Sequence, residues 1–331
     1  MSIAANPEGG SGRTLVYVHG KDFKPPADEL LDISVAALTA GIERDAPQFL
    51  DAFNALQKRI AYYGDCSNAF LREAGQRYDE TLDLEDRRNA LIQLRNLDKK
   101  KHFGVRNYDR LPGKTALPEF AADTFAPLLM RLGLSDALIR KVGVDVAEYW
   151  NPDSDFGSTL RGRVRDAVIA ALDSSNELFL ISHGTGCVVT WDVLWQLSHD
   201  DRFAPDYAER KIDVWLTAGA PLGDSMVQRR LFGAGKSGVA RYPTNIVSWH
   251  NVSAEDDYVS HDDTVADDFS SMMKQHQVSC IRDYCVYNLA VRYGRSNPHA
   301  SLGYLVHPRV TQLLTEWLQR MPLEELPEIS L

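Results

Sequence analysis

Residues 178–197 of the chain, LFLISHGTGCVVTWDVLWQL, combine three local patterns that decide the fold. The apolar run 178–181 is typical of a buried strand. The small residues of 182–186, SHGTG, allow a sharp turn. Apolar residues at 188, 189, 191 and 193–195 then follow a helical pattern. This stretch therefore predicts a strand, a tight turn and a helix in direct succession.

The same alternation recurs on both sides of this stretch. Strand-like runs are found at 14–18, 57–65, 212–217, 245–249 and, less clearly, 281–291, and helical patterns at 27–44, 167–172 and 310–320. Strands that alternate with helices predict an α/β fold with a doubly wound, mainly parallel sheet. In such sheets ligands bind beyond the C-terminal ends of the strands. Functional residues are therefore expected in the loops that follow the strands.

The chain divides into a short tail and one domain. Residues 1–13 predict a flexible tail, and residues 14–331 a single α/β domain that contains a helical insertion at about 66–153. The stretch between the loop after 14–18 and residue 184 is longer than two strand–helix units of roughly 30 residues each require. We expect the insertion to cap the C-terminal strand ends. An appendage at the far edge of the sheet and an oligomer interface are the alternatives.

The apolar residues of this insertion recur at spacings that suit docking of helices. They are Leu82, Leu84, Leu91, Leu94, Leu97, Phe120, Phe125, Leu128, Leu129 and Leu132. Charged pairs such as Glu85 and Arg88 stand at helical spacing between them and suit exposed helix faces.

Composition and charge exclude several classes of function. The net charge of −10 argues against nucleic acid or an anionic membrane surface as the main partner, because both require clustered basic residues. No apolar run approaches the roughly 18 residues of a membrane span, and the first residues lack the pattern of a secretory signal. We therefore expect a cytoplasmic protein without a membrane span and without nucleic acid as a partner.

The sequence predicts no metal site and no cofactor. The four cysteines, Cys66, Cys187, Cys280 and Cys285, lack C-x-x-C spacing, and we expect reduced thiols rather than disulfides or zinc ligands. Residues 233–237, GAGKS, end like a Walker A loop. Arg230 stands where that motif requires its first glycine, and the preceding residues are helix-like rather than strand-like. We therefore do not predict a P-loop.

The turn SHGTG resembles the nucleophile elbow, G-x-S-x-G, of the α/β-hydrolase family. The resemblance is to bacterial lipase- and esterase-like members, whose elbow is S-H-S-x-G followed by V-V-x-Y-D-V-L. It covers 14–20 and about 177–318 and leaves the insertion outside. It implies an α/β-hydrolase fold and ester hydrolysis. The residue at the nucleophile position is Gly184, so the resemblance predicts the scaffold without its usual serine.

The family order of nucleophile, acid and histidine places the acid at Asp257 and the base at His299. Asp256 and His307 are the closest rivals. The acid accepts a hydrogen bond from the histidine and fixes its tautomer. An exposed acidic loop is the alternative for 251–263, and a cation site formed by Asp256, Asp257, His261, Asp262 and Asp263 is another, although calcium-loop spacing is absent.

His19 and Gly20 follow the first strand and resemble the family's oxyanion loop. The backbone N–H groups of Lys21 and Thr185 would then bind the substrate oxygen. A plain strand-to-helix turn is the alternative, and SHGTG is itself similar to an H-G-x-G oxyanion motif. Neither Ser182 nor Cys187 is well placed to replace the missing hydroxyl.

Two hypotheses for function follow. The first is an ester-bond hydrolase with a degenerate elbow, whose activity rests on His299 and Asp257. The second is a catalytically silent pseudo-hydrolase that binds a small molecule or a protein partner in the old pocket. A third possibility is that serine stands at position 184 in the natural sequence.

Overall fold

The structure, a computed structural model, describes residues 12–113, 144–260 and 264–320. Its centre is a six-stranded sheet in the order β2-β1-β3-β4-β5-β6, in which every neighbouring pair is parallel. The strands are β1 (Arg13–Val18), β2 (Gln57–Ala61), β3 (Glu177–His183), β4 (Ile212–Ala218), β5 (Ile246–Ala254) and β6 (Cys280–Val286).

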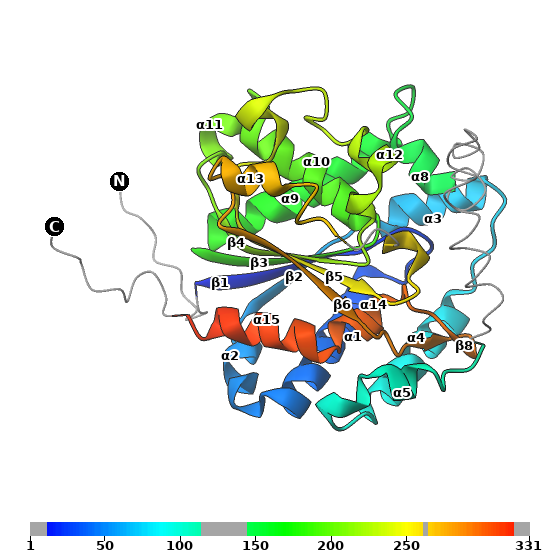
Figure 1. The fold of residues 1–331 in the computed structure, drawn as a ribbon. Coiled ribbons are helices and arrows are strands. Elements are labelled where there is room, and N and C mark those ends of the chain that lie inside the picture. Colours follow the sequence, from blue (N-terminus) through cyan, green and yellow to red (C-terminus); the bar gives the residue numbers. More distant parts are fainter. Residues whose placement is uncertain (1–11, 114–143, 261–263, 321–331) are drawn as a thin grey trace, which may run out of the picture.

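Helices cover both faces of this sheet (Figure 1). On one face lie α1 (Ala27–Asp45), α14 (Ser301–Leu305) and α15 (Pro308–Leu318), and on the other lie α9 (Phe156–Ser174) and α10 (Gly186–His199). The predicted doubly wound α/β fold with a parallel sheet is thus confirmed. No helix in the described part of the chain is both long and apolar enough to cross a membrane.

The remaining α-helices and strands of the described residues are short or belong to the expected insertion. They are α2 (Leu50–Asn54), α3 (Gly64–Glu73), α4 (Glu80–Arg95), α5 (Val105–Tyr108), α8 (Val144–Tyr149), α11 (Ala204–Tyr207), α12 (Ser225–Gln228), α13 (Ser270–Lys274) and the hairpin β7 (Val291–Arg292) with β8 (Arg295–Ser296). The part of the insertion that the structure describes is therefore helical. Phe120, Phe125, Leu128, Leu129 and Leu132 lie outside the described residues.

Strand β5 is longer than its sequence predicts, and this difference has a physical cause. Residues 251–254 include polar side chains, and the sequence predicts that they begin the acidic loop. In the structure they are buried because their side chains have partners: Thr217 donates to Asn251 at 2.8 Å, and Asn251 donates to Asp283 at 3.0 Å. These bonds between neighbouring strands offset the cost of burying the polar groups. The strand therefore continues to the acidic loop.

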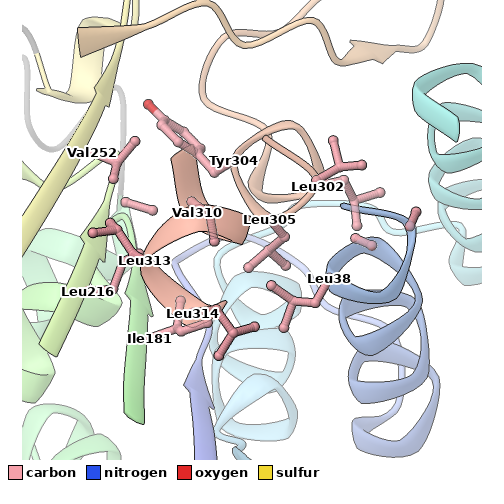
Figure 2. Close-up of a cluster of buried hydrophobic side chains, with 14 of the residues drawn as sticks. Leu38, Ile181, Leu216, Val252, Leu302, Tyr304, Leu305, Val310, Leu313 and Leu314 are labelled. Atoms are coloured by element: carbon pink, nitrogen blue, oxygen red, sulfur yellow. The ribbon is translucent and has the colours of Figure 1, made fainter. Parts of the chain in front are cut away.

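Two apolar layers hold the helices on the sheet. Figure 2 shows the layer between α1, α14, α15 and the sheet, in which Leu38, Leu305 and Leu314 meet Ile181 and Leu216. The other layer is built around Trp191, Trp215 and Trp249, which are almost completely buried. Strand residues therefore face apolar helices on both sides, as a parallel sheet requires.

The chain changes direction across the sheet between β1 and β3. From β1 it passes to β2 on one side, and it then returns over β1 to β3 on the other. Loops diverge at such a switch point and leave room for a ligand. The loop after β1 and the turn at Gly184 both lie at this point.

Helix α10 begins in close contact with the backbone that follows β1, and a substitution at Gly186 tests this contact. A Cβ at Gly186 would overlap the carbonyl oxygen of His19 and lie 3.0 Å from its carbonyl carbon. Because backbone cannot move aside easily, we predict that Gly186→Ala lowers the free energy of unfolding by about 1 to 3 kcal/mol. Urea titration measures this. Gly235→Ala, where a Cβ meets nothing within 4 Å, is the control. Equal losses in both variants would contradict the packing.

Candidate active site

The turn after β3 presents residue 184 to a histidine. Gly184 has φ +55°, and its N–H donates to Ala218 at 2.9 Å, which fixes the turn against the end of β4. A Cβ at this position would lie 3.0 Å from Nε2 of His299, 3.3 Å from Cε1 of the same ring and 3.8 Å from Cα of Gly20. A side chain at position 184 would therefore point at the edge of the His299 ring that carries Nε2.

His299 and Asp257 form a hydrogen-bonded pair. The Nδ1 atom of His299 lies 2.9 Å and 3.1 Å from the two carboxylate oxygens of Asp257. A carboxylate accepts, so Nδ1 carries the proton and Nε2 remains the basic nitrogen. The Asp257 side chain is fully buried, whereas that of His299 is 23% exposed. Nε2 has no hydrogen-bond partner among the described residues, and it faces Gly184.

Asp257 is a buried charge with several donors. Burial raises the pKa of Asp257, but the hydrogen bonds from His299, Tyr304 and the Val259 N–H outweigh burial and lower that pKa below its ordinary 3.8. The Tyr304 hydroxyl donates to Oδ2 at 2.5 Å and accepts from the Ala254 N–H at 2.9 Å. In Figure 2 the Tyr304 ring lies at the end of the apolar cluster beside Val252. The carboxylate is therefore kept ionised by fixed groups.

The backbone around His299 is held by two buried side chains. Asn288 donates to the carbonyls of Pro298 and Ala300 at 2.7 and 2.9 Å. His183 donates from Nε2 to the carbonyl of His299 at 2.8 Å, and the two rings lie 4.7 Å apart. Burial lowers the pKa of His183 well below its ordinary value, so this ring stays neutral. The loop therefore presents His299 in one orientation.

His19 supports the loop after β1 from inside. Its Nδ1 donates to the Gly20 carbonyl at 2.8 Å, and its Nε2 accepts the Tyr63 N–H at 3.1 Å. Burial lowers the pKa of His19 to about 3. Both ring nitrogens are thus occupied, and the side chain cannot serve as a base. Gly20, not the His19 side chain, is the part of this loop that approaches residue 184.

A buried lysine, Lys24, binds the backbone of the same loop. The Nζ atom of Lys24 donates to the carbonyls of Lys21, Asp22 and Phe23. Asn68 accepts from the Lys24 N–H at 2.9 Å and donates to its carbonyl at 2.7 Å. Burial lowers the pKa of Lys24 to about 8. The carbonyls are therefore turned toward the ammonium, which fixes the backbone next to Gly20.

Thr185 is the N-cap residue of helix α10, which begins directly after the turn. The first N–H groups of a helix have no acceptor within the helix, and the helix dipole favours negative charge there. The Thr185 N–H is thus suited to bind a developing oxyanion beside Gly184. The structure places Lys21 in the opposite loop, where its carbonyl accepts from Lys24.

The nearby hydroxyl and thiol do not replace serine. Ser182 is buried and shares hydrogen bonds with Thr190 at 2.9 Å and with Trp215 at 3.1 Å. Cys187 is completely buried, and burial raises its pKa, so a thiolate is disfavoured. None of the four cysteines forms a disulfide.

The rivals of Asp257 and His299 have other roles. Asp256, at φ +60°, accepts from the Tyr108 hydroxyl at 2.6 Å. His307 caps α15, where its Nδ1 accepts the Arg309 N–H at 3.0 Å. His261, Asp262 and Asp263 of the considered cation site lie outside the described residues. No group of three or more metal-binding side chains is found within 12–113, 144–260 and 264–320.

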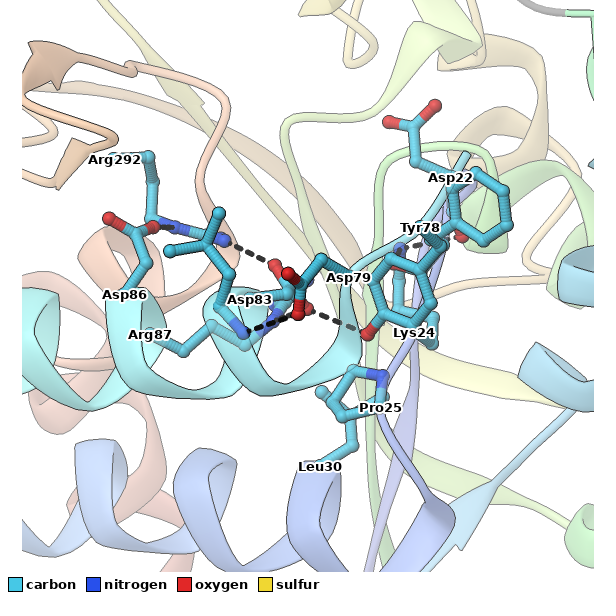
Figure 3. Close-up of polar contacts among 12 residues, drawn as sticks. Asp22, Lys24, Pro25, Leu30, Tyr78, Asp79, Asp83, Asp86, Arg87 and Arg292 are labelled. Atoms are coloured by element: carbon cyan, nitrogen blue, oxygen red, sulfur yellow. Dashed lines mark hydrogen bonds and ion pairs between the residues drawn. The ribbon is translucent and has the colours of Figure 1, made fainter. Parts of the chain in front are cut away.

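The insertion contacts three of the segments around the pair: the acidic loop, the loop after β1 and the hairpin before His299. Tyr108 bonds to the acidic loop, and Asp145 accepts the Asp22 N–H of the first loop at 3.1 Å. Helix α4 contacts the hairpin before His299: Arg292 pairs with Asp83 at 2.6 Å and with Asp86 (Figure 3). These contacts place the insertion at the C-terminal ends of the strands. Whether it walls the space at Gly184 remains a prediction.

A separate cavity lies at the N-terminal ends of the strands, away from Gly184. It has a volume of about 490 Å³ and is lined by residues before or at the start of β4, β5 and β6, among them Lys211, Ile246 and Ser279. Doubly wound sheets bind their ligands at the C-terminal edge. The candidate active site is therefore the region around Gly184, at the C-terminal ends of the strands.

The sequence alone did not indicate three residues that shape the pair: Gly219, Tyr304 and Asn288. Gly219 follows β4 with φ +56°, and a Cβ there would lie 2.8 Å from Asp257 Oδ2 and 3.1 Å from His299 Nδ1. A glycine directly after a strand, in the A-G-A-P stretch, was a usable signal. No local sequence signal indicated Tyr304 or Asn288, because their roles depend on contacts between distant segments.

Comparisons of the chain with protein-family models, curated proteins and solved structures give no match. The class that the fold itself defines is a doubly wound α/β protein with a histidine–carboxylate pair at the C-terminal edge of its sheet.

Gly219 allows a test of the pair that separates backbone strain from contact. We predict that Gly219→Ala pushes His299 and Asp257 apart and destabilises the protein more than Gly238→Ala does. Gly238 has a similar φ of +59°, but a Cβ there meets nothing within 4 Å. The strain of about 1 to 2 kcal/mol is common to both variants. Urea unfolding measures the difference, and equal losses would contradict the geometry.

Tyr304→Phe tests the buried charge. Removing a hydrogen bond to a carboxylate costs about 1.5 to 3 kcal/mol and raises the pKa of Asp257. A lowered carboxyl pKa gives stability that is present above the unfolded-state pKa and lost as the pH falls through the folded-state value. We predict that the difference from wild type in unfolding free energy is full above pH about 4 and shrinks below it. A difference that is independent of pH would contradict the role.

Proposed function

We propose that this protein is an ester-bond hydrolase of the α/β-hydrolase type in which His299 and Asp257 activate water directly. The observation that carries the proposal is the orientation of His299, whose Nε2 faces the side-chain position of Gly184 while Nδ1 is bonded to Asp257. This is the relation that a catalytic base has to its nucleophile. Without a serine, the nucleophile has to come from solvent.

The proposed step is a single displacement. Nε2 takes a proton from water while the water oxygen attacks the ester carbonyl carbon. Asp257 holds the tautomer and stabilises the imidazolium that forms. The imidazolium then donates its proton to the leaving alkoxide as the C–O bond breaks, giving an acid and an alcohol. General base catalysis of this kind contributes about 10²- to 10⁴-fold.

The negative charge of the tetrahedral intermediate requires donors. The Thr185 N–H at the start of α10 is one, and the dipole of that helix adds to it. Gly20 permits close approach because its Cα lies 3.8 Å from the position of a Cβ at residue 184. The loop that carries Gly20 is fixed by Lys24, so the backbone on this side of the site does not have to reorganise during the reaction.

A silent pseudo-hydrolase is the second candidate, and Gly184 itself favours it. The same pocket would then hold a small molecule or a partner without turnover. Activity assays separate the two candidates, because only the hydrolase depends on a basic nitrogen at position 299.

We predict slow hydrolysis of 4-nitrophenyl esters by the wild-type protein, about 10²- to 10⁴-fold faster than by His299→Asn. Gly184→Ala should lose most of this activity, since its Cβ would lie 3.0 Å from Nε2. Nitrophenolate release measures the rates, and Gly235→Ala is the control. Equal rates in the wild-type and His299→Asn proteins would refute direct water activation. The remaining candidate would then be the pseudo-hydrolase, which binds its ligand without turnover.

A second prediction concerns the missing nucleophile. Wild-type protein should not be labelled by a fluorophosphonate, whereas Gly184→Ser should be labelled at the introduced serine, because its Oγ would lie next to Nε2. The positive φ costs about 1 to 2 kcal/mol, so circular dichroism has to verify folding. Gly184→Ser combined with His299→Ala is the control and should stay unlabelled. A folded Gly184→Ser protein that resists labelling would show that His299 does not act on position 184.

A further inference from the structure

The cavity at the N-terminal ends of the strands takes no part in the proposed function. Its volume of about 490 Å³ lies within the range of about 300 to 1,000 Å³ that is typical of small-molecule sites. Its walls come from the starts of β4 and β5, from the segment at Val239, and from α13 with the turn that follows it. Gln277 donates to the Val239 carbonyl at 3.0 Å, and the Ser279 N–H donates to the Val247 carbonyl at 2.8 Å. These bonds join three of the walls to one another.

Part of the cavity wall is apolar. Ile246 and Val278 are buried at the starts of β5 and β6, and Met273 of α13 is half-buried. Val239 is also on this wall and remains 55% exposed. An alkyl group in the cavity would remove such apolar surface from water, which is favourable. The wall therefore suits an aliphatic part of a ligand.

The polar part of the wall carries positive charge. The Nζ atom of Lys211 donates to the Thr244 carbonyl at 2.9 Å, which uses one of the three N–H groups of the ammonium. The carboxylate of Glu209 lies 3.9 Å from the same Nζ, but its side chain is 95% exposed, so this ion pair is weak. None of the described residues that line the cavity is acidic. Lys211 is therefore able to pair with an anionic group in the cavity.

The charge of the surrounding chain has the same sign. Residues 225–254 contain no aspartate or glutamate, although the whole chain has a net charge of −10. The same stretch contains Arg229, Arg230, Lys236 and Arg241. Clustered charge of one sign raises the local concentration of ligands of the opposite sign. An anionic ligand is therefore favoured over a cationic one.

We propose that this cavity binds a small aliphatic monocarboxylate. The carboxylate pairs with the ammonium of Lys211, and the alkyl chain packs on Val239, Ile246 and Met273. A single negative charge matches the one lysine among the described lining residues. The site lies at the opposite ends of the strands from Gly184, so it does not depend on the proposed function.

The first test compares three ligands by isothermal titration calorimetry of the full chain. Hexanoate carries both the charge and the chain, acetate carries the charge alone, and hexanamide carries the chain without the charge. We expect hexanoate to bind at least about tenfold more tightly than acetate, because its extra CH₂ groups are taken out of water. We also expect it to bind about tenfold more tightly than hexanamide, because hydrogen bonds to charged groups are stronger.

The second test uses matched pairs of variants. Lys211→Met should weaken hexanoate binding about tenfold, whereas Lys236→Met removes the same charge at an exposed lysine outside the cavity and should bind like wild type. Val239→Asp places a carboxylate in the wall and should abolish detectable binding. Its control is Val105→Asp, at a valine that is 51% exposed and lies outside the cavity. Urea unfolding verifies that all four variants are folded.

Several results would overturn the inference. Absence of hexanoate binding is one, and equal binding of hexanoate and hexanamide is another. Equal losses in Lys211→Met and Lys236→Met would show an effect of net charge rather than a site. Binding that persists in Lys211→Met but is lost in His299→Asn would place the carboxylate at the candidate active site. That last result would overturn the second site and leave the proposed function intact.

Discussion

The burial of the Asp257 carboxylate is the constraint on which the site depends. A fully buried charge is costly unless it is paired and hydrogen-bonded. Three donors meet this requirement here: His299, Tyr304 and the Val259 N–H. Each comes from a segment that has to be in its native position to donate. The charge therefore ties the end of β5, the acidic loop and α14 to one arrangement.

The same constraint explains why the insertion matters. Asp257 follows Asp256, whose backbone has a positive φ and whose side chain is bonded to Tyr108. The His299 loop follows a hairpin that Arg292 ties to helix α4 through buried ion pairs. The insertion is thus part of the framework that holds the loops, in addition to any role as a cover. Breaking buried ion pairs of this kind usually costs about 3 to 5 kcal/mol.

The sequence predicted the sheet well because strand patterns can be recognised from neighbouring residues alone. The runs at 14–18, 178–181 and 212–217 show strand patterns, and their order with the helices limits the topology to few solutions. It also placed residue 184, Asp257 and His299 in loops at the same edge. The role of His19 as a buried support could not be predicted, since the position of Tyr63 beside it depends on the packing of β2. Tyr304 and Gly219 were missed for the same reason: their importance arises only when distant segments meet around Asp257.

The most direct test of the His299–Asp257 pair is the protonation pattern of His299, observed by nitrogen-15 NMR at mildly alkaline pH. We expect the proton on Nδ1, a slowly exchanging downfield Nδ1–H signal that disappears in Asp257→Asn, and an unprotonated Nε2 whose shift changes in Gly184→Ser. A ring protonated on Nε2 alone, or an Nε2 signal that does not respond to Gly184→Ser, would contradict the claim that Nε2 of His299 is the basic nitrogen and faces residue 184.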